Sequence, residues 1–256
     1  MSAALQDKLG TPEKRGLAIS ANRAVHWLAR HWIVVFAILA GLYAGLPWLA
    51  PVLMQMGWTS AGQVIYAFYS TQCHQLPQRS FFLFGPQAMY SLDQIQAWVG
   101  PTNDPVVLRQ FIGNAELGWK VAWSDRMVAM YTGLALIGGL WWPLRRRVRA
   151  LSWWGFGLLL LPMGMDGLTH MVSDFAGLGQ GFRDSNAWLA ALTGNALPAA
   201  FYAGDALGSF NGWMRLITGA LFALGVVWLA FPYLERMMAD AAAQIEAKFE
   251  RAGLRL

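Results

Sequence analysis

The sequence predicts an all-α integral membrane protein: a bundle of four transmembrane helices with interfacial helices on the extracytoplasmic side. Hydrophobic residues make up 56% of the 256-residue chain and charged residues only 13%, and there are 14 Trp. This balance is typical of a chain that uses lipid as solvent, and it excludes most soluble classes. The net charge of +5 is segregated along the chain in the way that membrane topology requires, so we expect no nucleic-acid partner.

The first predicted span covers residues 32–56, which carry no charge. A stretch of this length crosses a hydrocarbon core of about 30 Å with some tilt, at a rise of about 1.5 Å per residue. It is too long for the apolar region of a signal peptide. Residues 1–31, which are basic and contain no apolar run, form the predicted cytoplasmic N-terminal segment.

Three further spans follow, at residues 127–144, 151–171 and 213–233, the last before a charged C-terminal helix at residues 234–256. Four arginines separate the middle pair of spans: Arg145, Arg146, Arg147 and Arg149. Such a cluster marks a cytoplasmic loop. With both termini cytoplasmic in the cell membrane, 13 of the 19 Lys and Arg residues lie inside, as the positive-inside rule requires.

The predicted external parts are a cap over residues 57–125 and a segment at residues 187–204. The cap contains an apolar, aromatic helix over residues 59–69 and a short helix that Asp104 or its neighbour Asn103 caps before Pro105. Residues 187–204 are uncharged but interrupted by Asn195, Pro198 and glycines. We interpret them as a re-entrant or interfacial helix pair. The alternative is a fifth span, which would place the C-terminus outside.

Polar residues from four segments gather at the outer ends of these spans. Asp166 and His170 are four residues apart and share a helix face, as do Asn211 and Arg215. Charges are costly in lipid and usually turn toward partners or water. The candidate polar site comprises Cys73, His74, Arg79, Asp125, Arg126, Asp166, His170, Asn211 and Arg215.

An ordered set of short motifs runs through residues 66–228: Cys73-His74-Gln75 with Arg79-Ser80, Arg126 with Tyr131 and Gly133, Asp166-Gly167, and Ser209, Asn211, Arg215 and Thr218-Gly219. This set resembles the domain-of-unknown-function family 2085, small polytopic membrane proteins without an agreed activity. Many members of that family have a Cys-x-Arg-Cys pattern before the second span. This chain has Ser124, Asp125, Arg126 and Met127 at the corresponding positions. Many also have Gln where this chain has His170. These departures weaken the case for a cysteine-rich metal site.

Each polar group has a chemical and a structural interpretation. Cys73, His74, Asp166 and His170 are residue types that bind a divalent metal such as zinc. Alternatively, Cys73-His74 is a structural turn, and His170 is held by its helix neighbour. Arg126 and Arg215 fit a phosphate or carboxylate lipid head group, but pairing with Asp125 or Asp166 would equally lock helices together.

Three function classes follow. The first is an enzyme or binding protein with an outward-facing polar site, and the second is a non-catalytic scaffold or accessory subunit for a membrane-protein partner. A small transporter is least favoured, because no polar residue continues a path through the middle of the spans. A functional site requires at least four of His74, Arg126, Asp166, His170 and Arg215 around one cavity, with an arginine contacting a carboxylate.

The topology can be tested by thiol labelling. If the arginine loop is cytoplasmic, a cysteine placed at Arg147 should stay unlabelled by a membrane-impermeant reagent in intact cells, whereas an accessible Cys73 should react. Labelling at position 147 without labelling at Cys73 would invert the topology.

Overall fold

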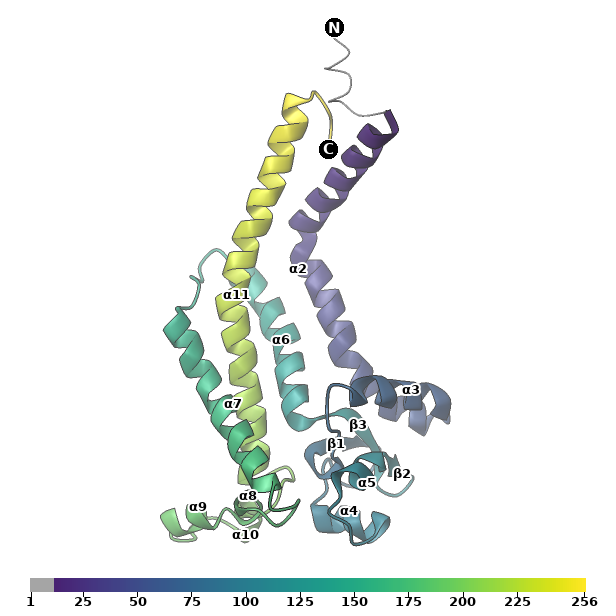
Figure 1. The fold of residues 1–256 in the computed structure, drawn as a ribbon, viewed down its shortest axis with the longest axis vertical. Helices are drawn as coiled ribbons and strands as arrows, with labels where there is room; N and C mark the ends of the chain where they lie inside the picture. Colours follow the sequence, from purple (N-terminus) through teal and green to yellow (C-terminus); the bar gives the residue numbers. More distant parts are fainter. Residues whose placement is uncertain (1–11) are drawn as a thin grey trace.

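The computed structural model describes residues 12–256, and four long helices run along its long axis (Figure 1). These helices are α2 (Pro12–Gln55), α6 (Asp125–Leu144), α7 (Trp153–Asp174) and α11 (Phe210–Arg251). The start of α2 and the C-terminus lie at one end of the bundle, and the small helices and strands gather at the other (Figure 1).

Three of these helices, α2, α6 and α11, are long and apolar enough to cross a membrane, which indicates a membrane location. They contain three of the four predicted spans. The fourth predicted span corresponds to α7, whose C-terminal half carries Asp166, His170 and Asp174. These residues lower the hydropathy of α7, so α7 is not among the candidate spans within residues 12–256. The fourth crossing therefore stays a prediction.

The helices α2 and α11 continue far beyond the rest of the bundle at the terminal end (Figure 1). At about 1.5 Å per residue, each is roughly twice as long as a hydrocarbon core of about 30 Å is thick. The extensions are joined by polar contacts: His26 and Arg30 lie 2.8 and 2.5 Å from Glu246, and Trp32 donates to Glu235 at 2.8 Å. The basic N-terminal segment is thus helical from residue 12, and its earlier part lies outside the described residues.

Helix α11 packs against α2, α6 and α7. Small residues allow its close approach to α6: a Cβ built at Gly219 would lie 2.9 Å from the Cβ of Ala129, and one at Gly133 would lie 2.8 Å from the Cβ of Ala223. Such pairs let helices approach closely within lipid. Toward the terminal end the core is aromatic instead, with Trp32, Trp141 and Phe231 in mutual contact.

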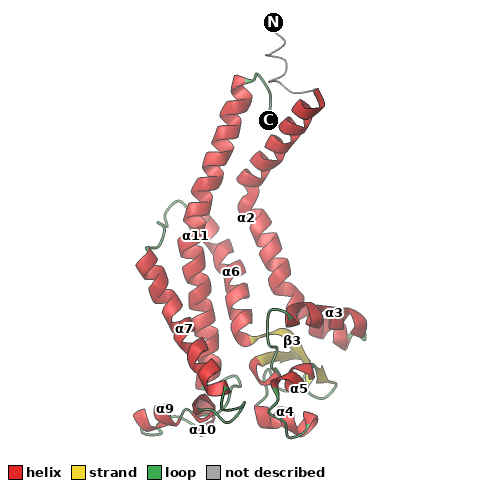
Figure 2. Cartoon of the chain, viewed as in Figure 1, coloured by secondary structure: helices red, strands yellow, loops and turns green. Residues whose placement is uncertain are grey.

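The cap contains α3 (Thr59–Ser70), η1 (Pro77–Arg79), β1 (Ser80–Leu83), α4 (Leu92–Val99), α5 (Pro105–Gln110), β2 (Gly113–Asn114) and β3 (Gly118–Ser124). The helix predicted at residues 59–69 is α3, and Asp104 caps α5 by accepting from the Val106 N–H at 2.7 Å. The all-α prediction missed the antiparallel sheet of order β1-β3-β2, which is yellow in Figure 2. Its middle strand is buried, with Val121, Ala122 and Trp123 at 0% exposure.

The segment before α11 folds at the cap end of the bundle (Figure 1). It contains α8 (Phe182–Ser185), α9 (Ala187–Leu192) and α10 (Ala199–Tyr202). A turn with positive φ at Gly194 and Asn195 separates α9 from α10. Residues 187–204 thus contain two short helices, of six and four residues, each too short to cross a bilayer by itself. Their re-entrant or interfacial position stays a prediction.

The close contact between α6 and α11 gives a stability prediction. Gly133→Leu should destabilise the protein by about 1–3 kcal/mol, because the new side chain meets Ala223 and overpacks the interface. The measurement is thermal unfolding in detergent. Gly139→Leu is the matched control on the same helix, since a Cβ there meets nothing within 4 Å. Equal stability of the two variants would show that Gly133 does not lie in a tight interface.

Candidate functional site

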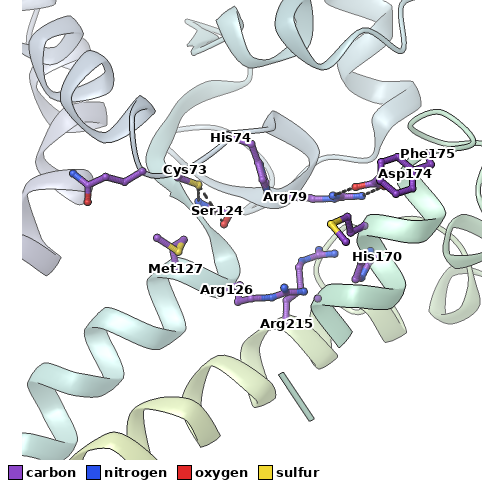
Figure 3. Close-up of a pocket in the computed structure, with 13 residues that line it drawn as sticks. Cys73, His74, Arg79, Ser124, Arg126, Met127, His170, Asp174, Phe175 and Arg215 are labelled. Atoms are coloured by element: carbon purple, nitrogen blue, oxygen red, sulfur yellow. Dashed lines mark hydrogen bonds and ion pairs between the residues drawn. The ribbon is translucent and has the colours of Figure 1, made fainter. Parts of the chain in front are cut away.

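A cavity of about 440 Å³ lies where the cap meets the bundle. Figure 3 shows the segments that contribute to it, which are the cap segment 72–79, the first turn of α6, the C-terminal half of α7 and Arg215 of α11. Its lining is polar on the cap side and includes apolar side chains from α6 and α7, namely Met127, Met171 and Phe175. Met171 and Phe175 are also exposed on the outer surface, at 52% and 80%. The cavity therefore adjoins an apolar outer surface.

A chain of buried ion pairs joins the cap to α6 and α11. Asp205 lies at its centre, accepting from Arg79 Nε and Arg215 Nη1, each at 2.7 Å. Arg215 Nε also donates to both carboxylate oxygens of Asp125 at 2.8 Å. Arg79 makes a two-pronged contact with Asp174, at 2.7 and 2.8 Å. Two arginines and three aspartates are thereby linked.

A second group of ion pairs surrounds Asp166. Its two carboxylate oxygens accept separately from Arg126 Nη2 and Arg183 Nη2, both at 2.7 Å. The Arg183 guanidinium also contacts His170 Nε2 at 3.2 Å and donates to Asn211 Oδ1 at 3.1 Å. Asp166 is 2% exposed, and a carboxylate buried to this extent needs charged partners such as these arginines.

The structure separates the nine predicted site residues into two sets. Six line the cavity: Cys73, His74, Arg79, Arg126, His170 and Arg215. Asp125 and Asp166 lie behind the lining and hold its arginines. Asn211 donates to the carbonyls of Arg183 and Gly204 at 2.7 and 2.9 Å, so it holds the segment before α11. Four of the five residues predicted to converge therefore surround one cavity, and all three lining arginines contact carboxylates.

The Cys73-His74-Gln75 segment is a structural turn. The Cys73 sulfur accepts backbone N–H groups of Gln75 and Ser124, both at 3.4 Å. Gln75 has a φ of 51°, and its amide donates to the carbonyls of Tyr66 and Ala122 at 3.0 Å. The side chains of Cys73 and Gln75 thereby fix the turn to α3 and β3.

His74 remains available at the cavity. Its Nδ1 accepts the Leu76 N–H at 3.2 Å, so the neutral ring carries its proton on Nε2. The residue is accessible to solvent through the cavity, but protein surrounds it densely. Desolvation by the surrounding protein, together with the Arg79 charge, lowers the pKa of His74. His74 is therefore a neutral hydrogen-bond donor at neutral pH.

Lys120, which is fully buried in β3, supports the turn from behind. Its ammonium donates to the carbonyls of Gln75 and Arg109 at 2.8 and 2.7 Å. Burial lowers the pKa of Lys120 to about 7. Lys120 thus connects the turn to the end of α5.

The predicted metal ligands Cys73, His74, Asp166 and His170 do not form a metal centre. Within residues 12–256 no three His, Cys, Asp or Glu side chains group closely enough to hold an ion. The physical reason is that each oxygen of Asp166 is occupied by an arginine, while the Cys73 sulfur is held by backbone amides. His170 Nε2 lies 3.8 Å from Asp166 and contacts Arg183 instead.

Two polar atoms in the cavity lining have no hydrogen-bond partner: Arg126 Nε and His170 Nδ1. Buried polar atoms are normally satisfied, and an exception calls for a functional or solvent explanation. Arg126 is the less constrained arginine of the lining, since one contact to Asp166 is its only carboxylate interaction within residues 12–256. Arg126 and His74 are therefore the candidate hydrogen-bond donors of the cavity.

Three residues of the network were not predicted: Asp174, Arg183 and Asp205. Asp174 follows Asp166 and His170 by the same four-residue step, so the helical period could have identified it. Arg183 and Asp205 lie in the irregular segment between α7 and α11. Neither position follows a period from which their convergence could be predicted.

The position of Asp205 between two arginines predicts a pH-dependent stability. Burial alone would raise the pKa of Asp205, but Arg79 and Arg215 outweigh it and hold this pKa below its usual range. Asp205→Asn should cost about 3 kcal/mol at neutral pH, because two buried guanidinium groups each lose one of their two carboxylate partners. As the pH falls below about 4, the unfolded state binds a proton that the folded state does not, so the advantage of the native chain should shrink.

Thermal unfolding of the two proteins between pH 7 and pH 3 measures this advantage. Asp240→Asn, at an exposed position of α11, is the control and should leave stability unchanged. An advantage that stays constant down to pH 3 would mean that Asp205 is not the ionised partner.

Comparisons with known proteins assign no activity to the chain. No family model matches the chain, and no solved structure matches it. A sequence relative is the "Uncharacterized protein MJ1492" of Methanocaldococcus jannaschii, which is 25% identical over 153 residues. The alignment covers 57% of this chain and 76% of the relative. The chain is thus similar to an archaeal protein of uncharacterised function.

Proposed function

We propose that the cavity between the cap and the bundle binds an amphiphile with an anionic head group, a phosphate or a carboxylate. The observation that carries this proposal is the open volume of about 440 Å³ lined by Arg126, whose guanidinium makes one ion pair, with Asp166, and whose Nε–H has no protein partner within residues 12–256. A guanidinium with free N–H groups in a partly dry cavity is a strong donor for such oxyanions.

The charges around the cavity favour an anion over a cation. Arginines 79, 126 and 215 line it, against the single carboxylate of Asp174. The carboxylates of Asp125 and Asp166 lie behind, with their oxygens facing arginine nitrogens. Neutral His74 adds a further N–H donor. A cation would meet guanidinium groups first, whereas an oxyanion would meet donors.

The apolar part of the lining supports an amphiphile rather than a free ion. Met127, Met171 and Phe175 border the cavity on the side of α6 and α7. Lipid-bound or lipid-like ligands need such a continuous path from a polar pocket to an apolar surface. The thioether side chains of methionine adapt readily to a flexible chain.

We further propose four crossings, with α7 as the fourth, both termini in the cytoplasm and the cap outside. Helix α7 has 22 residues, enough for about 30 Å. Its exposed face is apolar, with Leu158, Leu161 and Leu168 at 69%, 57% and 54% exposure. Helix α3 also has exposed apolar residues, Val64 and Phe68, which suit a position at the membrane interface. The cavity would then lie at the extracytoplasmic boundary.

A non-catalytic scaffold is the second candidate. The ion pairs themselves favour it, because they connect the cap, α6, α7 and α11 and would lock helices together without any ligand. The two proposals differ at Arg126. A scaffold needs its bond to Asp166, whereas a binding site needs the N–H groups that Asp166 leaves free.

Arg126→Lys separates these roles, since lysine keeps a charge for Asp166 but removes the guanidinium fork. Dodecyl phosphate should raise the thermal unfolding temperature of the native protein in maltoside detergent, because a ligand of the folded state stabilises it. The variant should bind the probe roughly 10- to 100-fold more weakly, the worth of a charge-assisted hydrogen bond.

Arg109→Lys is the matched control, because Arg109 lies in the cap near Ser70 and outside the cavity lining. Dodecanol, which has the chain but no anionic group, tests the head-group requirement. Stabilisation by dodecanol equal to that by dodecyl phosphate, or equal binding by Arg126→Lys and native protein, would reject the anion site. A variant that is only less stable would support the scaffold.

A further inference from the structure

A second basic cavity, of about 390 Å³, lies at the other end of α6, away from the cap. Five arginines and one glutamate line it together with two apolar residues: Arg145, Arg146, Arg147, Val148, Arg149, Pro232, Glu235 and Arg236. We propose that this cavity binds the phosphate of an anionic phospholipid head group. The proposal is independent of the function proposed for the first cavity.

The charges in this second cavity are largely uncompensated. Its one carboxylate, Glu235, lies 3.5 Å from Arg145 Nε, and the Arg145 guanidinium also stacks over Trp142 at 3.6 Å. The other four guanidinium groups have no carboxylate within 4.0 Å among residues 12–256. Several arginine forks around one open volume are the arrangement that phosphate oxygens require.

The loop that carries four of these arginines is held in place. The Arg147 N–H donates to the Leu144 carbonyl at 2.8 Å. Trp228 of α11 donates from its indole to the Arg149 carbonyl at 3.0 Å and accepts the Leu151 N–H at 3.2 Å. A fixed backbone lowers the entropy lost when the side chains order around a ligand.

The depth of the cavity favours a lipid over a soluble anion. The next helix begins directly after the loop with Trp153 and Trp154, which are 71% and 88% exposed. Exposed tryptophans at helix ends lie at the level of lipid head groups. Basic pockets between transmembrane helices at this level are suited to anionic lipid head groups.

Membrane topology alone does not account for this arrangement. A topology determinant needs positive charge in the loop and no particular shape. Here Arg236 and Glu235, which lie on α11, complete the wall of the cavity formed by the loop between α6 and α7. A concave site built by two separate segments points to a bound group.

Native mass spectrometry of the full chain in neutral detergent tests the proposal with dioleoyl phosphatidylglycerol and dioleoyl phosphatidylcholine. Phosphatidylglycerol should be retained preferentially. Replacing Arg146, Arg147 and Arg149 together by Gln should weaken its retention about 100-fold, since each charge contributes roughly a factor of five near an anionic lipid.

Lys248→Gln, Arg251→Gln and Arg255→Gln together form the matched control, which removes three charges at exposed positions near the end of the chain and should leave retention unchanged. Arg126→Lys, at the first cavity, should also leave it unchanged. If the triple loop variant does not fold, Arg146→Gln with Arg147→Gln carries the same test, because both side chains are exposed.

Equal retention of the two lipids would overturn the proposal, as would equal losses in the loop variant and its control. Displacement of phosphatidylglycerol by inorganic phosphate at equal concentration would also overturn it, because the site would then recognise a free anion and not a lipid.

Discussion

The buried contact of Asp205 with Arg79 and Arg215 is the constraint on which the arrangement of cap and bundle depends. Asp205 comes from the irregular segment before α11, Arg79 from the cap and Arg215 from α11 itself. All three are at most 5% exposed. A fold that buries a charge without its partner is several kcal/mol less stable. The three segments are therefore stable together and not apart. The cavity exists because they meet around a shared wall of guanidinium groups.

Much of this arrangement could be predicted, and the limits have physical causes. Long apolar runs, the arginine loop and four-residue spacing identified three candidate spans and six of the cavity residues, because helical period and lipid solubility are local properties of the sequence. The sheet was missed because β3 is short and runs directly into α6 at Ser124, so its buried residues resemble the start of an apolar helix. Arg183 and Asp205 were missed because tertiary pairing alone brings them to the site.

The contacts of individual residues in the fold change the chemistry that their types predict. Cys73 and Asp166 are residue types that bind metals, but an ion needs several such ligands around one point, and within residues 12–256 no three His, Cys, Asp or Glu side chains group in that way. In the fold, backbone amides hold the sulfur and two arginines hold the carboxylate. The sequence shows residue type and spacing, but only the packed structure shows which hydrogen-bonding groups already have partners. Arg126 has one carboxylate partner, whereas Arg215 has two.

The two ends of the bundle use arginine in opposite ways, and burial explains the difference. At the cap end the guanidinium groups are buried, so each needs an aspartate, and recognition there rests on the few N–H groups that remain after pairing. At the loop end Arg146, Arg147 and Arg149 are exposed, so they need no partner and attract anions mainly through their summed charge. The proposed ligand of the buried end therefore depends on the few donors left after pairing, whereas the proposed lipid of the exposed end meets several arginine forks around one cavity.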